Sequence, residues 1–123
     1  MGFRVHAEPN PQPIQFIGET AWDNVVVELL GEKYEYHNVW LNTGGNKRLT
    51  PEGSQYVLDK LIEAKRKLYE LKGLQPPEEK FDYSFESDEN YTDNDPILPT
   101  RFYNRVVTFL KQTIDNNNYL NGY

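Results

Sequence analysis

Residues 50–73 of the 123-residue chain, TPEGSQYVLDKLIEAKRKLYELKG, predict its longest helix. A threonine followed by a proline marks a helix start, because the Thr50 hydroxyl can cap free backbone amides and proline is tolerated at the first helical position. Apolar residues then recur at intervals of four and three, as one face of an amphipathic helix requires. They are Val57, Leu61, Ala64, Leu68 and Leu71. We expect the helix to end near Gly73, with Glu63 and Lys67 forming an ion pair one turn apart.

The N-terminal part of the chain predicts strands. FRVH (3–6) and IQFI (14–17) are short and half apolar, and the prolines between them are incompatible with a helix. NVVVELL (24–30) and KYEYHNVWL (33–41) flank a Gly-Glu pair, and glycine at the first central position suits a two-residue turn. We therefore predict that these two segments form a β-hairpin.

The remaining segments predict a loop, a strand, a helix and a tail. NTGGNKRL (42–49) is rich in glycine and asparagine, which favours a loop. In KFDYSFE (80–86), aromatic rings alternate with polar side chains, which is the period of a strand. A loop follows as far as Pro99, and Thr100 is placed to cap a last helix. DNNNYLNGY (115–123) then predicts a polar tail.

Strands grouped before helices favour an α+β fold. We expect one domain over residues 1–123, with a mostly antiparallel sheet of four to five strands and two helices packed on one face. An acidic strand-plus-loop segment (76–99) and an Asn-rich C-terminal tail (115–123) complete it. The chain is long enough to bury a core, and it contains no cysteine, so no disulfide supports the fold.

Negative charge is gathered in one part of the sequence. The net charge is −6, but residues 76–96 hold eight acids and one base, or −7, whereas the rest holds eleven acids and twelve bases, or +1. A net negative chain is a poor match for a phosphate backbone, so we expect no direct binding to nucleic acid. Acids so close together repel one another, and solubility alone does not require that arrangement.

This acidic aromatic region predicts a docking surface for a basic protein, because rings supply contact energy and charge steers association. The alternative is an acidic loop that serves solubility alone. The residues expected to contact a partner are Asp82, Tyr83, Glu86, Asp88, Glu89, Tyr91, Asp93 and Asp95. The partner would present a basic surface, for example one that otherwise holds nucleic acid. The protein would then be a non-catalytic binding factor, an inhibitor or accessory protein of viral or mobile-element type.

A second hypothesis comes from PTRFYNR (99–105). Arg101 and Arg105 are one turn apart near a helix N-terminus, where the helix dipole disfavours cations, so a negative group is expected nearby. Asp93 and Asp95 of the chain itself can supply it, and so can an anionic ligand. In the ligand case the protein sequesters a phosphorylated, nucleotide-like molecule without turning it over. The binding residues would be Arg101, Phe102, Tyr103, Asn104, Arg105, Lys47 and Arg48.

A third hypothesis is a structural subunit of a larger assembly such as a virion, or a homo-oligomer, in which extended segments reach across neighbours. Enzymatic activity is not expected, because no Ser, His and Asp spacing indicates a nucleophile with an oriented base. No metal or cofactor is expected either, since DENYTDND (88–95) lacks the glycine and the glutamate that an EF-hand loop needs.

The sequence also bears on localisation. The N-terminus lacks the charged-then-apolar pattern of a signal peptide, and no apolar run approaches the ~20 residues needed to cross a bilayer. We expect a soluble, cytoplasmic protein without membrane contact, found in the host cell or virion if it is viral.

Overall fold

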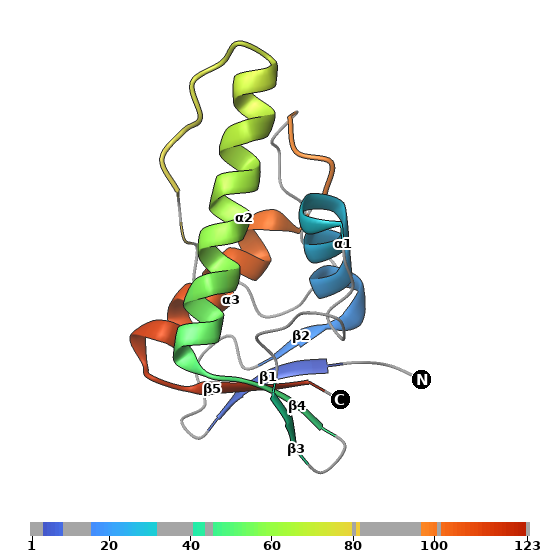
Figure 1. Ribbon diagram of the computed structural model, residues 1–123, viewed down its shortest axis with the longest axis vertical. Helices are drawn as coiled ribbons and strands as arrows, with labels where there is room; N and C mark the ends of the chain where they lie inside the picture. Colours follow the sequence, from blue (N-terminus) through green and yellow to red (C-terminus); the bar gives the residue numbers. More distant parts are fainter. Residues whose placement is uncertain are drawn as a thin grey trace.

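The computed structural model describes residues 4–8, 16–31, 41–43, 46–79, 81, 97–100 and 102–122. Five strands and three helices are found within them. They are β1 (Arg4–Glu8), β2 (Phe16–Gly18), α1 (Glu19–Leu30), β3 (Leu41–Thr43), β4 (Asn46–Leu49), α2 (Pro51–Leu71), α3 (Tyr103–Asp115) and β5 (Tyr119–Gly122). All three helices lie on one face of the sheet (Figure 1). The predicted α+β class with a mostly antiparallel sheet is confirmed, with one helix more than expected.

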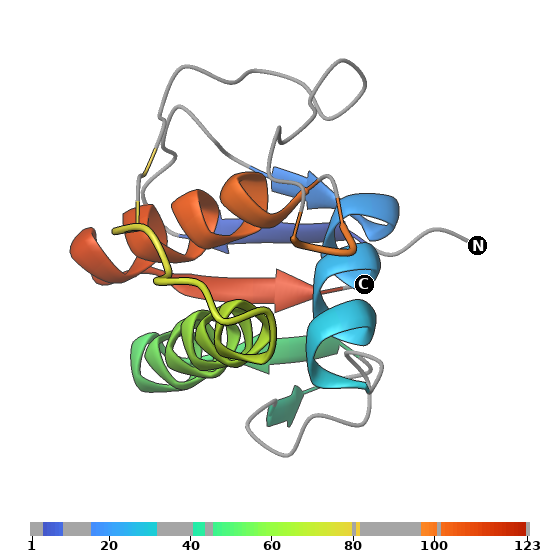
Figure 2. The same ribbon diagram turned by 90° about the horizontal axis from the view of Figure 1, so that it is seen from above.

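The sheet has five antiparallel strands in the order β2-β1-β5-β4-β3. β5 is the last element of the chain, yet it lies between β1 and β4 (Figure 2). Leu120 of β5 is level with Ala7 of β1 and with Leu49 of β4. The first and last strands therefore pair with each other, and the last one completes the sheet.

The polar tail predicted for residues 115–123 is therefore wrong, because β5 lies within it. One of its asparagines ends the preceding helix. Asn117 adopts a left-handed backbone conformation with φ 54°, which asparagine tolerates better than most residues, and so ends α3. In β5 itself, exposed Tyr119 precedes fully buried Leu120, so one face of the strand belongs to the core.

The core lies between the sheet and the helices. From the sheet, Val5, Ile17 and Leu120 are fully buried, and they pack in one cluster with Trp22 of α1 and Phe109 of α3. Full burial of a large apolar side chain contributes about 1.5–3 kcal/mol. This single cluster joins all three helices to one face of the sheet.

Residues 24–30 are helical, so the predicted hairpin is wrong at its first strand. The buried apolar residues of α1 are Ala21, Trp22, Val25 and Val26. Their spacing is that of a helix. It becomes visible only when the residues before the consecutive valines are included, because the valines taken alone favour a strand by their β propensity. Gly31 has the positive φ that the predicted turn required, 77°, but its amide donates to the Val27 carbonyl at 2.9 Å and so caps α1. Residues 33–40 lie outside the described residues.

The segment 42–49, predicted to be a loop, contributes instead to two paired strands. Thr43 of β3 is paired with Asn46 of β4, and Asn42 with Lys47, which leaves two residues between the strands. Two glycines between short extended runs are a hairpin signal as well as a loop signal. The sequence contained that signal, but it was assigned to the preceding Gly-Glu pair.

α2 confirms the helix, its cap and its ending as predicted from residues 50–73. The predicted place of Leu71 on the core face is wrong, because that side chain is 83% exposed near the end of the helix. The Thr50 hydroxyl accepts a hydrogen bond from the Gly53 amide at 3.1 Å, and Pro51 is the first helical residue. At the other end, the Leu74 amide donates to the Tyr69 carbonyl at 3.0 Å, and Gly73 has φ 69°. This is a Schellman ending, which glycine accommodates without strain. No helix within the described ranges is both long and apolar enough to span a membrane.

α3 begins at Tyr103, close to the predicted start. The Thr100 hydroxyl accepts a hydrogen bond from the Phe102 amide at 3.2 Å, although Phe102, not Thr100, directly precedes the helix. The predicted strand over 80–86 lies outside the described residues except for Phe81, which is partly buried against the core.

Candidate functional site

The residues predicted to contact a basic partner all lie outside the described residues. They are Asp82, Tyr83, Glu86, Asp88, Glu89, Tyr91, Asp93 and Asp95. The structure does describe the chain on either side of them, at Glu79 and Phe81 and again over residues 97–100. We call residues 82–96 the acidic segment.

On the N-terminal side, Glu79 is held by two side chains from different helices. The Lys65 Nζ of α2 lies 3.1 Å from the Glu79 Oε2. The Tyr103 hydroxyl of α3 donates to the Glu79 Oε1 at 2.8 Å, and the Lys65 Nζ also lies 4.9 Å from the centre of the Tyr103 ring. We call Lys65, Glu79 and Tyr103 the anchor cluster. It ties the chain that follows α2 to the junction of α2 and α3.

The anchor cluster is largely withdrawn from water. The side chain of Lys65 is 6% exposed and that of Glu79 is 16% exposed, while Tyr103 is fully buried. Burying two charges is costly, and the cost is recovered only when both are paired and hydrogen-bonded. Both carboxylate oxygens of Glu79 have a partner here, one of them a cation. Displacing Glu79 would leave Lys65 as an uncompensated buried charge, so this attachment is energetically well defined.

On the C-terminal side, Leu98 and Thr100 return the chain to the core. Leu98 belongs to the buried cluster between the helices and the sheet. Thr100 is buried, and its hydroxyl lies 3.4 Å from the Asn24 side-chain oxygen of α1. An apolar contact and polar contacts thus hold this end beside α1 and α3.

The described chain is therefore attached to the helices on both sides of residues 82–96. Glu79 makes the attachment on the N-terminal side, and Leu98 and Thr100 make it on the C-terminal side.

The residues of the nucleotide-binding hypothesis are not gathered into one exposed site. Phe102, Tyr103 and Arg105 are buried, so neither ring offers an open face on which a base can stack. Asn104 is partly exposed, and Arg101 lies outside the described residues. The backbone of Lys47 is in β4, but its side chain is also outside the described part. Arg48, from the same strand, lies over the Tyr119 ring, with its Cζ 4.8 Å from the ring centre.

A polar group on the sheet escaped sequence reasoning. The Asn121 amide of β5 donates to the Glu8 carboxylate of β1 at 2.6 Å, and the His6 Nε2 lies 3.1 Å from the other oxygen of that carboxylate. Arg48 and Tyr119 belong to the same surface, because Arg48 is paired with Asn121 and Tyr119 with Glu8. The alternation Tyr119-Leu120-Asn121 is the sequence signal for this strand. It spans only three residues beside a run of asparagines, whose composition is more typical of a tail.

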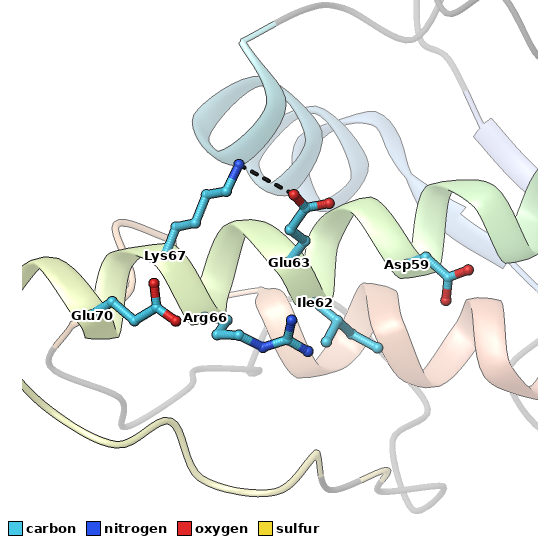
Figure 3. A pocket seen from close by; sticks show the side chains of 6 residues that line it. All are labelled: Asp59, Ile62, Glu63, Arg66, Lys67 and Glu70. Carbon is cyan, nitrogen blue, oxygen red and sulfur yellow. Dashed lines mark ion pairs between the residues drawn. The ribbon is translucent and has the colours of Figure 1, made fainter.

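Metal binding has no support among the described residues, where no group of three His, Cys, Asp or Glu side chains is placed to hold an ion. Several open hollows lie along α2. One of them, of about 410 Å³, is lined by Asp59, Ile62, Glu63, Arg66, Lys67 and Glu70 (Figure 3). Open hollows with charged walls suit contact with another macromolecule better than enclosure of a small molecule.

Comparisons of the chain with protein-family models, with curated proteins and with solved structures find no match.

Proposed function

We propose that this protein is a non-catalytic protein-binding factor that presents its acidic segment to a basic surface of a partner. The observation that carries the proposal is the segregation of charge: the acidic segment holds six acids and no base, whereas the rest of the chain holds thirteen acids and thirteen bases. The anchor cluster adds support, because it fixes the chain three residues before the acidic segment begins. An inhibitor or accessory role follows if the segment covers a surface that the partner uses for another ligand.

The physical basis is complementarity of charge combined with aromatic contact. Clustered carboxylates raise the rate at which a basic partner is encountered, and this steering weakens as salt screens it. Tyr83 and Tyr91, within the same segment, supply rings of the kind enriched at the centres of interfaces. Binding through this segment should therefore depend both on salt and on a few named carboxylates.

The test compares three tagged proteins as bait in the lysate of the native host. They are the wild type, a segment variant and a matched control variant. The segment variant carries Asp88→Asn, Glu89→Gln, Asp93→Asn and Asp95→Asn. The control changes four exposed acids elsewhere, Glu8→Gln, Glu28→Gln, Glu52→Gln and Asp115→Asn, and so alters net charge equally.

We expect mass spectrometry to identify a basic protein that is captured by the wild type and by the control but not by the segment variant. With that protein purified, its dissociation constant for the wild type should rise with salt concentration, and the salt dependence should be smaller for the segment variant. Equal capture by all three baits, or binding that is insensitive to salt, would refute the proposal.

A further inference from the structure

Most of the exposed large apolar side chains in the described part of the chain lie on α2 or in the turn that follows it. These are Tyr56, Leu71, Leu74 and Tyr119, and only Tyr119 lies away from α2 and its C-terminal turn. Leu71 is 83% exposed. α2 begins at the sheet and rises away from it, so that its C-terminal end projects from the domain (Figure 1). The outward face of α2 is therefore accessible along much of its length.

Between Tyr56 and Leu74, the outward face carries a regular alternation of charge. Lys60, Glu63, Lys67 and Glu70 are separated by three, four and three residues, which places them on one line along the helix. That line is opposite the buried stripe that includes Val57, Leu61 and Lys65. We call these four residues the α2 ridge. Its charges read plus, minus, plus, minus.

Neighbouring cations on α2 favour the charged form of Glu63. The Glu63 carboxylate lies 3.2 Å from the Lys67 Nζ (Figure 3), and this contact, with Lys60 and Arg66 nearby, holds the pKa of Glu63 below its ordinary value of 4.5. The Lys60 Nζ lies 5.5 Å from the centre of the Tyr56 ring, which joins the charged line to the aromatic residue at its N-terminal end.

Two shallow hollows share Glu63 and Lys67 among their walls. The first is the 410 Å³ hollow described above, to which Ile62 contributes apolar surface. The second, of about 330 Å³, is lined on its apolar side by Leu29, Leu30, Ala64 and Leu68 from α1 and α2. A ridge with a hollow on each side is the surface shape by which helices interlock.

We propose that two copies of this chain associate through their α2 ridges, with the two helices antiparallel. When the ridge is laid against a reversed copy of itself about position 65, Lys60 meets Glu70 of the second copy, and Glu63 meets its Lys67. Tyr56 of each copy then lies near the C-terminal end of the other helix. From Tyr56 to Leu71, the last helical residue, the contact extends over about 22 Å, at about 1.5 Å per residue.

The alternation of charge selects this occupant over others. A parallel pair would place like charges opposite each other at all four positions, and like charges in contact are unfavourable. A purely basic or purely acidic partner would meet two repelling charges on the ridge. A reversed copy meets only opposite charges, and antiparallel helices also align their dipoles favourably. The surface is therefore complementary to itself, as a two-fold interface must be.

The experiment measures molar mass by light scattering across a range of protein concentrations. One variant makes the ridge acidic, Lys60→Glu with Lys67→Glu, and the other makes it basic, Glu63→Lys with Glu70→Lys. All four side chains are on the outward face, and circular dichroism will check that the helices remain. We expect the wild type to form a dimer as its concentration rises and each variant alone to remain monomeric.

An equimolar mixture of the acidic and basic variants should recover the dimer, because each ridge then meets its opposite. A wild type that stays monomeric at every concentration would overturn the proposal. So would a mixture that fails to associate, or variants that dimerise as the wild type does. The segment variant described under Proposed function should dimerise normally, since the two proposals rely on different residues and can fail separately.

Discussion

Two ion pairs on α2 have nearly the same length and very different surroundings. Lys65 Nζ lies 3.1 Å from Glu79, and Lys67 Nζ lies 3.2 Å from Glu63. The first pair is 6% and 16% exposed at its two side chains, and it joins α2 to a residue fourteen positions further along the chain. The second is 68% and 47% exposed and joins neighbouring turns of one helix. The distance between nitrogen and oxygen alone therefore does not show which pair contributes more to stability.

Their surroundings decide what each pair contributes. In water, an exposed pair is screened and holds two flexible side chains that lose entropy when ordered. In the buried pair, neither charge can be left without its partner, so the contact fixes one arrangement of α2, α3 and the chain between them. The exposed pair leaves its charges available to another molecule. The buried pair suits a structural anchor, and the exposed pair suits an interface.

The largest effect is expected for Lys65→Met. This change leaves the Glu79 carboxylate largely buried without its cation, so the free energy of unfolding should fall by about 3–5 kcal/mol. Urea denaturation followed by circular dichroism measures it. Lys67→Met, which removes the same chemical group from the exposed pair, is the matched control. A loss below about 1 kcal/mol, in the range of exposed pairs, would show that the anchor cluster is not a buried pair in solution.

A smaller net change in the free energy of unfolding is expected when the whole anchor cluster is made apolar. The triple variant carries Lys65→Met, Glu79→Leu and Tyr103→Phe. Removing all partners leaves no buried charge, and such replacements are often neutral or stabilising. Unfolding measurements should therefore place the triple variant close to the wild type and well above Lys65→Met alone. A triple variant as unstable as the single one would mean that packing around Lys65, rather than its charge, carries the effect.

The smallest effect on stability is expected at the exposed pair, where the readout is a pKa. Because Lys67 holds the pKa of Glu63 below its ordinary value of 4.5, Lys67→Met should raise it toward that value in an NMR titration of the side-chain carboxyl. A lowered pKa in the folded state means that the stabilisation is present above 4.5 and is lost as the pH falls through the folded value. An unchanged Glu63 pKa in Lys67→Met would show that this contact is absent in solution.

The helices α1 and α2, which flank the β3–β4 hairpin, show which parts of the fold could be predicted. For α2, the cap, the apolar stripe and the terminal glycine agree, and every signal comes from residues within a few positions of one another. For α1, three valines favoured a strand, and Gly31 fits a turn or a helix end equally well because both require positive φ. A helix buries Ala21 and Trp22 together with the valines in one core, and this burial depends on the rest of the core.

The candidate site divides in the same way. Segregation of charge is visible in a count of residues, and so the acidic segment could be proposed from the sequence. The anchor cluster could not. Helical spacing places Lys65, unlike Lys67, on the buried face of α2, but it does not identify a partner, and nothing local distinguishes Glu79 from Glu78. Glu78 and Lys67 are exposed, whereas Glu79 meets a lysine and a tyrosine from two different helices. Such a contact is specified by packing rather than by spacing.

What could be learned from the linear order of residues was local or compositional: α2 with both of its ends, the α+β class, and the uneven distribution of charge. Folding in three dimensions assigned the remaining roles. It made an asparagine-rich C-terminus the middle strand of the sheet and turned a valine-rich run into a helix. It also made Glu79 a largely buried anchor between two helices. The reason is that hydrogen-bonded strands and buried charges need partners from distant parts of the chain, and local propensity carries no information about those partners.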